Sequence, residues 1–174
     1  FQINADNIVL DCNGYTITGN NSGYGVNITN RENVTVKNCK LINFSNGIYA
    51  TGNGNHTLRD NIINTSVTDG YGIYLNNPDA SLIWNNTITT TGTTAYGIYL
   101  DNSADTNNIS KNTVTTLGNV GYAIHLAGSS KDINIDMIDT SSSDRKNIGI
   151  VNIIADEDTS SVYIQNFNSE NANV

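Results

Sequence analysis

The side chains that could do chemistry in this chain are few and widely spaced. Two cysteines, Cys12 and Cys39, and two histidines, His56 and His125, occur in 174 residues. The cysteines do not form a Cys-x-x-Cys pair and no Cys–His pairing is present, so the spacing is not that of a metal site. Nucleophilic catalysis also requires a base beside the nucleophile. Since no such pair can be named, we assign no catalytic residue, no metal ligand and no cofactor.

The charged residues do not form a recognisable site either. Arg31, Arg59 and Arg145 are scattered, and no carboxylates cluster beside them. An acidic run in ADEDTSS, residues 155–161, contains Asp156, Glu157 and Asp158. It either touches Ca²⁺ or is a solvated loop. Because it lacks the regular donor spacing of a calcium loop, the second reading is favoured.

Composition and charge exclude several classes of function. The net charge is −8 and no basic cluster exists, which argues against nucleic acid and anionic membranes as partners. No apolar run approaches the roughly 20 residues needed to span a bilayer, and no signal peptide is visible. We expect one domain over residues 1–174 that is a fragment of a longer chain.

A repeat organises the whole sequence. The string YGIYL occurs at residues 71–75 and again at 96–100. Extended along the chain, Gly or Ala followed by Val or Ile recurs in steps of 22, 25, 25, 26 and 26 residues. The pairs are Gly25-Val26, Gly47-Ile48, Gly72-Ile73, Gly97-Ile98, Ala123-Ile124 and Gly149-Ile150. Such a fixed period is typical of a solenoid.

A second pattern runs in register with the first: an apolar residue, a polar residue three later and an apolar residue two after that. It is clear at Leu58–Asn61–Ile63, Ile83–Asn86–Ile88 and Ile109–Asn112–Val114, and weaker at Val36–Cys39–Leu41, Ile133–Asp136–Ile138 and Val162–Gln165–Phe167. Each unit holds only short alternating stretches, with no room for a helical stripe. The sequence therefore predicts an all-β fold, a right-handed parallel β-helix of about six to seven coils.

Stacked coils place equivalent residues in columns about 4.8 Å apart. We expect Asn61, Asn86 and Asn112 at a sharp turn, with left-handed backbone and amides bonded to one another. The Val and Ile of the first pattern should form an inward column, joined by Ile28, Leu75, Leu100 and Leu126.

Tyrosines should form two further columns. Tyr49, Tyr74, Tyr99 and His125 alternate with the inward column and should point outward, as an aromatic stripe. This stripe could stabilise the sheet by ring contacts, form a contact surface for a partner, or bind glycans. Tyr24, Tyr71, Tyr96 and Tyr122 should pack inward or at a corner.

The two cysteines are separated by about one coil. If their turns are stacked, Cys12 and Cys39 have Cα atoms about 5 Å apart, within disulfide range. They are then either bonded or a pair of small buried thiols. An extracellular location favours the bond.

The residues NIVLDCNGYTITG (7–19), VTVKNCKLIN (34–43), NGIYA and YGIYL resemble a known family. The family is that of right-handed parallel β-helix proteins with NosD-like or carbohydrate-binding-and-sugar-hydrolase repeats, found in secreted archaeal and bacterial surface proteins. The resemblance implies the fold, but not one function, because the family includes enzymes, adhesins and structural proteins. The Asn-Thr-Asp, Asp-Asp and Gly-His-Gly strings of pectin-type hydrolases are absent.

From these observations we expect a non-catalytic structural β-helix of an extracellular, adhesive or filament-forming protein, located outside the cell or on its surface. Its partners would be further copies stacked end to end or adjacent domains of the parent. The alternative is a polysaccharide-binding or polysaccharide-processing module. Candidate N-glycosylation sites, in a number close to chance, are Asn20, Asn27, Asn33, Asn43, Asn55, Asn64, Asn85 and Asn108.

Overall fold

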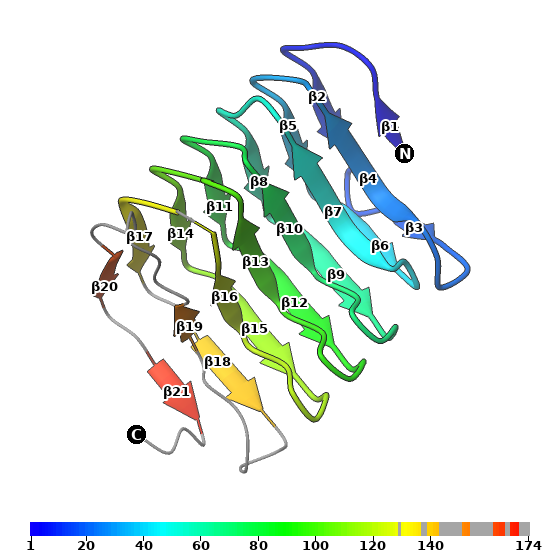
Figure 1. Ribbon diagram of the computed structural model, residues 1–174. Coiled ribbons are helices and arrows are strands. Elements are labelled where there is room, and N and C mark those ends of the chain that lie inside the picture. The colour runs from blue at the N-terminus through cyan, green and yellow to red at the C-terminus, as the bar shows by residue number, and fades with distance from the viewer. Residues whose placement is uncertain (129, 137–138, 143–150, 154–161, 166–167, 171–174) are drawn as a thin grey trace.

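The computed structural model describes residues 1–128, 130–136, 139–142, 151–153, 162–165 and 168–170. These residues form a parallel β-helix, as predicted, and none of them is helical. The chain visits three parallel sheets in turn, so that three strands make one coil and each sheet contains seven strands. Figure 1 shows the coils following one another from the N-terminus to the C-terminus. No described segment is a helix that could cross a bilayer.

Every strand is short, and each pairs in parallel with its equivalents one coil away. The first sheet contains β1 (Gln2–Ile3), β4 (Tyr24–Thr29), β7 (Asn46–Thr51), β10 (Ile73–Asn76), β13 (Ile98–Asp101), β16 (Ile124–Leu126) and β19 (Val151–Ile153). The second contains β2 (Val9–Asp11), β5 (Thr35–Lys37), β8 (Thr57–Arg59), β11 (Leu82–Trp84), β14 (Asn108–Ser110), β17 (Ile133–Asp136) and β20 (Val162–Gln165). The third contains β3 (Thr16–Thr18), β6 (Lys40–Ile42), β9 (Ile62–Thr65), β12 (Thr87–Thr90), β15 (Thr113–Thr116), β18 (Asp139–Ser142) and β21 (Asn168–Glu170).

The core consists of aliphatic columns that run along the solenoid. Ile48, Ile73, Ile98 and Ile124 are in register and buried, and Leu75 and Leu100 lie beside them. Stacking β-branched residues in this way removes them from water and fills the narrow interior. The predicted inward column is confirmed in these coils. The next position is taken by Val151, which pairs with Ile124, whereas the predicted member Ile150 lies outside the described residues.

In the sixth coil the second pattern was placed two residues off. Ile109 pairs with Ile135 and not with Ile133. Ile135 in turn pairs with Ile164, while Ile133 and Val162 pair with each other, as the pattern aligned them. Ile133 and Ile135 are both apolar and both buried. Because residues two apart share one face of a strand, the apolar pattern fits either alignment, and sequence alone does not choose between them.

Three corners connect the sheets. At the third corner, which lies between the third and first sheets, glycine allows the backbone and a core side chain to approach closely. A Cβ on Gly72 would lie 2.5 Å from the carbonyl oxygen of Gly97 and 2.3 Å from a methyl group of Ile88. Gly72 and Ile73 therefore both face inward, and the usual alternation is broken. As a consequence, the tyrosine that precedes this glycine faces outward.

Candidate functional site

The most distinctive surface is an aromatic array on the outside of the first sheet. The predicted stripe is in register, with Tyr49, Tyr74, Tyr99 and His125 at equivalent positions. A second column, at the entrance to the strands, joins it. Both columns are in contact through their rings, and the array consists of Tyr24, Tyr49, Tyr71, Tyr74, Tyr96, Tyr99, Tyr122 and His125.

The rings of the array cover one another. Within one column, Tyr74 and Tyr99 are stacked with ring centroids 4.7 Å apart and planes at 9°. Within the other, Tyr71 and Tyr96 are 5.2 Å apart at 15°. Between the columns the rings meet edge to face, for example Tyr71 with Tyr74 at 77°. Both geometries are favourable for aromatic pairs, and they leave ring edges and hydroxyl groups as the parts that face solvent.

His125 occupies the outward position expected for it, in register with Tyr99. It continues the column but is only 5% exposed, because it packs against the rings of Tyr96, Tyr99 and Tyr122. Burial lowers the pKa of His125, although the nearby Asp101 carboxylate acts in the opposite direction. The imidazole is therefore mainly neutral at pH 7 and belongs to the stack.

Asp101, at the end of β13, ties two phenols together. It accepts hydrogen bonds from the hydroxyl groups of Tyr99 at 3.1 Å and Tyr74 at 3.4 Å. Burial, followed by the charge of Asp101, raises the pKa of both tyrosines well above the ordinary value. These phenols are held protonated, which makes them hydrogen-bond donors and not bases or nucleophiles.

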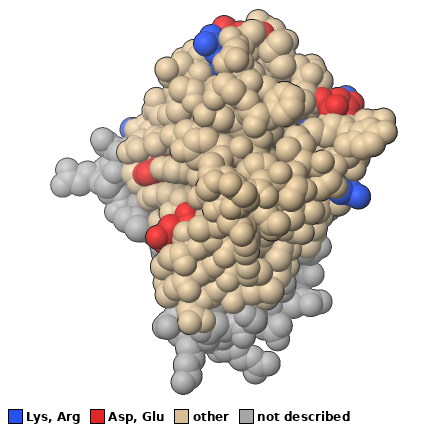
Figure 2. Space-filling model, turned by 90° about the vertical axis from the view of Figure 1, so that its right-hand side faces the viewer, with Lys and Arg blue, Asp and Glu red and all other residues tan. Residues whose placement is uncertain are grey.

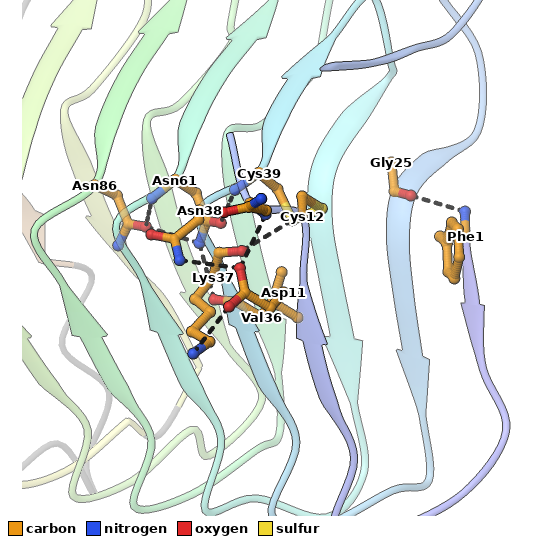
Figure 3. The surroundings of a disulfide bond; sticks show 11 residues. Phe1, Asp11, Cys12, Gly25, Val36, Lys37, Asn38, Cys39, Asn61 and Asn86 are labelled. Atoms are coloured by element: carbon orange, nitrogen blue, oxygen red, sulfur yellow. Dashed lines mark hydrogen bonds and ion pairs between the residues drawn. A yellow bond between two sulfur atoms is a disulfide. The ribbon is translucent and has the colours of Figure 1, made fainter. Parts of the chain in front are cut away.

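The second corner, between the second and third sheets, contains the cysteines. Cys12 and Cys39 are joined by a disulfide, with Cα atoms 4.7 Å apart (Figure 3). Cys39 is buried and Cys12 is half-buried. The bond fastens the first coil to the second at one point of the corner.

The column of Cys39 continues into the asparagine column. Asn61, Asn86 and Asn112 are each about 1% exposed. Their amides bond in series, from Asn61 Nδ2 to Asn86 Oδ1 at 3.0 Å and from Asn86 Nδ2 to Asn112 Oδ1 at 3.0 Å. The predicted amide ladder is therefore present. The left-handed backbone was assigned one residue too late, since it lies at the preceding positions, Asn38, Asp60, Asn85 and Lys111.

Beside the disulfide, Asp11 has three polar partners. Its carboxylate accepts hydrogen bonds from Asn38 Nδ2 at 3.0 Å and from the backbone N–H of Asn13 at 2.9 Å, and it pairs with Lys37 at 3.1 Å. These contacts, that of Asn38 above all, lower the pKa of Asp11 to about 2. A groove of about 370 Å³ opens next to the disulfide. It is lined by Asn13, Gly14, Asn38, Cys39, Lys40, Asp60 and Ile62.

The first corner, between the first and second sheets, carries a polar column that the sequence patterns missed. His56, Ser81 and Asn107 occupy successive coils and are each 1% exposed or less. Each accepts the backbone N–H of the residue one coil earlier: His56 from Val34, Ser81 from His56, and Asn107 from Ser81. Steps of 25 and 26 residues separate the three, so the repeat period was the one available indication.

The remaining charged groups are dispersed. Arg31 lies 3.9 Å from Asp6, and Arg59 pairs with its neighbour Asp60. Figure 2 shows a largely uncharged face with isolated charges. Among the described residues no group of three potential metal ligands comes together. Arg145 and the acidic run at residues 155–161 lie outside the described residues.

The candidate glycosylation sites differ in exposure. Asn27 and Asn108 are half-buried. The others are exposed, namely Asn20, Asn33, Asn43, Asn55, Asn64 and Asn85. Four of the exposed sites, Asn33, Asn43, Asn55 and Asn85, have left-handed backbone and lie at turns.

Taken together, these sites can hold coils together and offer hydroxyl and amide groups to a ligand. Hydrolysis of a glycosidic bond would require an acid and a base on opposite sides of that bond. The polar pairs seen in the described coils bridge within or between coils instead, such as the Tyr99 hydroxyl with Asp101 and the backbone N–H of His56 with Ser81.

Comparison with known proteins gives one result. A family model described as "Periplasmic copper-binding protein (NosD)" matches residues 1–173. Neither the curated proteins nor the solved structures contain a significant match to the chain. The family model covers almost the full sequence and is consistent with the parallel β-helix described above. This chain therefore belongs to the NosD family of β-helix proteins.

Proposed function

We propose that this domain is a non-catalytic structural β-helix of the cell envelope or exterior, which acts as a rigid scaffold. The observation that carries the proposal is that polar side chains contact neighbouring coils. Both cysteines and both histidines contact neighbouring coils, and so do Asp79 and Asp105, which accept backbone N–H groups from the next coil at 2.8 and 2.7 Å. Groups bound in this way hold the solenoid together.

Two observations support a location outside the cytoplasm. The family description refers to a periplasmic protein. Independently, Cys12 and Cys39 are bonded, and disulfides persist in oxidising compartments such as the periplasm and the cell exterior. The six exposed sequons would be acceptors for N-glycans if the host glycosylates secreted proteins.

The backbone of β2 supports stacking on another β-layer. Val9, on the edge strand β2, pairs with Thr35, whose N–H donates to the carbonyl of Ile8 at 2.8 Å. In a parallel pair the bonding groups alternate, so the N–H and C=O of Val9 itself point away from β5. Its side chain is 62% exposed. Such an edge is a template for a further strand, from another coil or from a second copy.

The test of stacking is sedimentation of the chain at increasing concentration, with electron microscopy of the particles. We expect end-to-end oligomers. Val9→Pro should abolish them without loss of stability, because it removes an outward N–H and no ladder bond. Ile62→Thr, which removes an exposed apolar group away from the edge, is the matched control and should associate normally.

A monomeric chain at high concentration would contradict the stacking. Cleavage of pectin, alginate or a similar polymer by the purified chain would contradict the non-catalytic role. The two outcomes are separate, since a scaffold can act within one parent protein without self-association.

Glycan binding is the second candidate, and the aromatic array favours it. Tyr74, Tyr99, Asp101 and Asn76 form a connected set of hydrogen-bonding groups on one face. The stacked rings weigh against the usual stacking of a sugar on a free ring face, so recognition would rely on hydroxyl groups. Loss of binding to uronate or neutral glycans in Tyr74→Ala and Tyr99→Ala, but not in Tyr15→Ala, would support this candidate. Tyr15 is 75% exposed and outside the array.

The described cysteines and histidines do not accommodate copper, the metal named in the family description. Copper sites use thiolate, thioether and imidazole ligands. Here the two sulfurs of Cys12 and Cys39 are bonded to each other, and both imidazoles are buried in contacts with other coils. We therefore assign no copper chemistry to the oxidised domain.

A further inference from the structure

Three Asn-Gly pairs occur in this chain, at Asn13-Gly14, Asn46-Gly47 and Asn53-Gly54. Asparagine is a thermolabile residue. A following glycine makes it more reactive, because the glycine nitrogen has no side chain beside it to hinder its approach to the asparagine amide. The three pairs share this chemistry, so a large difference in their reactivity would have to come from the fold.

In two of the pairs the next coil holds the glycine nitrogen. The N–H of Gly14 donates to the carbonyl of Asn38 at 2.7 Å, and that of Gly47 donates to the carbonyl of Tyr71 at 3.0 Å. Asn46 is also buried, and its Oδ1 accepts the N–H of Tyr71 at 2.9 Å. Before either glycine nitrogen could attack, its hydrogen bond would have to break.

The third pair, between β7 and β8 at the first corner, has no such restraint. Asn53 is exposed. Neither its side-chain amide nor the N–H of Gly54 has a hydrogen bond to any described residue. The fold nevertheless requires glycine here, since a Cβ at position 54 would lie 2.0 Å from the carbonyl oxygen of Asp79. A bulkier residue, which would slow the reaction, therefore does not fit.

We propose that Asn53 is a site of spontaneous deamidation, which the fold leaves open there and suppresses at Asn13 and Asn46. The nitrogen of Gly54 attacks Cγ of Asn53 and forms a new N–C bond, while the bond from Cγ to the amide nitrogen breaks. The proton of the Gly54 N–H passes through solvent to the leaving nitrogen, which departs as ammonia. Water then opens the resulting succinimide ring at one of its carbonyls and yields aspartate or isoaspartate. No oxidant, reductant or enzyme is required.

Opening to isoaspartate would change the first corner itself. The main chain then runs through the former side chain, and the former main-chain carbonyl of residue 53 becomes a free carboxylate. That carbonyl is the group that lies 3.0 Å from Nε2 of the buried His56. The reaction therefore introduces a negative charge beside the polar column of this corner.

The test is incubation of the folded chain in mildly alkaline buffer, followed by tryptic peptide mapping in a mass spectrometer. Water labelled with heavy oxygen, present only during incubation, marks the conversions that precede digestion. Cleavage after Lys40 and Arg59 releases one peptide that contains two of the pairs, and its fragment ions report each pair separately. We expect Asn53 to convert at least about tenfold faster than Asn13 or Asn46, because breaking one backbone hydrogen bond slows the reaction by about that factor. In urea, where these bonds are lost, the three rates should converge.

Asn53→Gln and Asn13→Gln are the matched variants. Both positions are exposed, and glutamine must close a larger ring, which is slower. Asn53→Gln should remove most of the isoaspartate that the folded chain forms, measured by enzymatic methylation, whereas Asn13→Gln should leave its rate of formation unchanged.

Equal conversion of the three pairs in the folded chain would overturn the inference. So would isoaspartate formation that Asn53→Gln does not reduce. An unreactive Asn53 in the folded chain, over a period in which the chain in urea converts, would also overturn it, because the fold would then protect this pair as well.

Discussion

The first and second corners of the solenoid meet the same need with different residues. At both, a buried side chain accepts the backbone N–H of the residue one coil earlier. At the second corner the acceptors of successive coils are Asn61, Asn86 and Asn112, at 3.0, 3.1 and 2.9 Å. At the first they are His56, Ser81 and Asn107, at 3.4, 3.0 and 2.8 Å. A corner therefore requires an acceptor at a fixed place and not one residue type.

The difference lies in the bonds between the side chains themselves. Asn86 accepts from the amide of Asn61 and donates to that of Asn112, so the second corner is a continuous chain of side-chain hydrogen bonds. At the first corner the side chains bond to backbone groups instead, such as Asn107 Nδ2 to the carbonyl of Pro78 at 3.0 Å and the Ser81 hydroxyl to the carbonyl of Asp79 at 3.2 Å. An amide that both donates and accepts explains why one residue type is reused at the second corner.

The largest effect is expected from a charge placed in the core of the solenoid, on which both corners depend. Ile98→Asp should lower the free energy of unfolding by about 4 kcal/mol or more, because an unpaired carboxylate would enter an aliphatic column. Ile98 is fully buried. Urea unfolding monitored by circular dichroism measures the change.

Thr87→Asp is the matched control for this charge. Thr87 is exposed on the outer face of the third sheet and pairs with the uncharged Ile62 and Thr113, so the change should be within about 0.5 kcal/mol. Similar effects of the two substitutions would mean that the inward and outward faces have been exchanged.

The next largest effect should come from interrupting the asparagine column. Asn86→Leu leaves the backbone N–H of Asn61 and the carbonyl of Leu58 buried without their partners. At about 1–3 kcal/mol for each buried group, we expect a loss of about 3 kcal/mol in urea unfolding. Asn64→Ala, at an exposed asparagine in the neighbouring coil, should change stability by no more than about 0.5 kcal/mol. Equal losses in the two variants would contradict a special role for the column.

This contrast between corners also explains what the sequence could and could not predict. The second corner was predictable because Asn61, Asn86 and Asn112 repeat in letter as well as in position. The first corner was not, because an imidazole, a hydroxyl and an amide share only the ability to accept a hydrogen bond. A search for repeated residue types does not detect a repeated chemical role.

The aromatic array was predicted in part, for a geometric reason. Strict alternation along β10 and β13 places Tyr74 and Tyr99 outward, as observed. It fails one step earlier, where Gly72 and Ile73 both face inward and turn Tyr71 to the outside. The close approach that only glycine permits is a property of the stacked coils, and one coil of sequence does not reveal it.

A smaller effect, which tests the comparison directly, is expected at Ser81. Ser81→Ala removes the acceptor for the N–H of His56, while the N–H of Ser81 itself keeps its bond to Asn107 Oδ1. One lost partner should reduce the free energy of unfolding by about 1–2 kcal/mol, less than at Asn86.

Ser81→Asn then makes the first corner resemble the second. The new amide can accept from the N–H of His56 and donate toward Asn107, so we expect stability within about 1 kcal/mol of the original chain. If this variant in urea unfolding is less stable than Ser81→Ala, the first corner depends on the size of the residue and not on its capacity to accept a hydrogen bond.

The smallest effect is a dependence on pH that the first corner has and the asparagine column lacks. Burial lowers the pKa of His56 from its ordinary value of 6.5, against the opposing effect of its contact with the carbonyl of Asn53. That carbonyl can only accept, so Nε2 carries the proton and Nδ1 is the acceptor for Val34. A second proton, on Nδ1, would face the N–H of Val34 and break this bond. Below about pH 6.5 the unfolded chain therefore binds more protons than the folded chain, and stability falls as the pH is lowered through this range toward the folded-state pKa.

Urea unfolding at pH 8 and pH 5 should show this loss, and His56→Asn should reduce it, since an amide accepts the same N–H without titrating. His125→Asn serves as the control, because it removes the other buried imidazole and leaves the contribution of His56 in place. An unchanged pH dependence in His56→Asn would mean that this corner does not contribute to it.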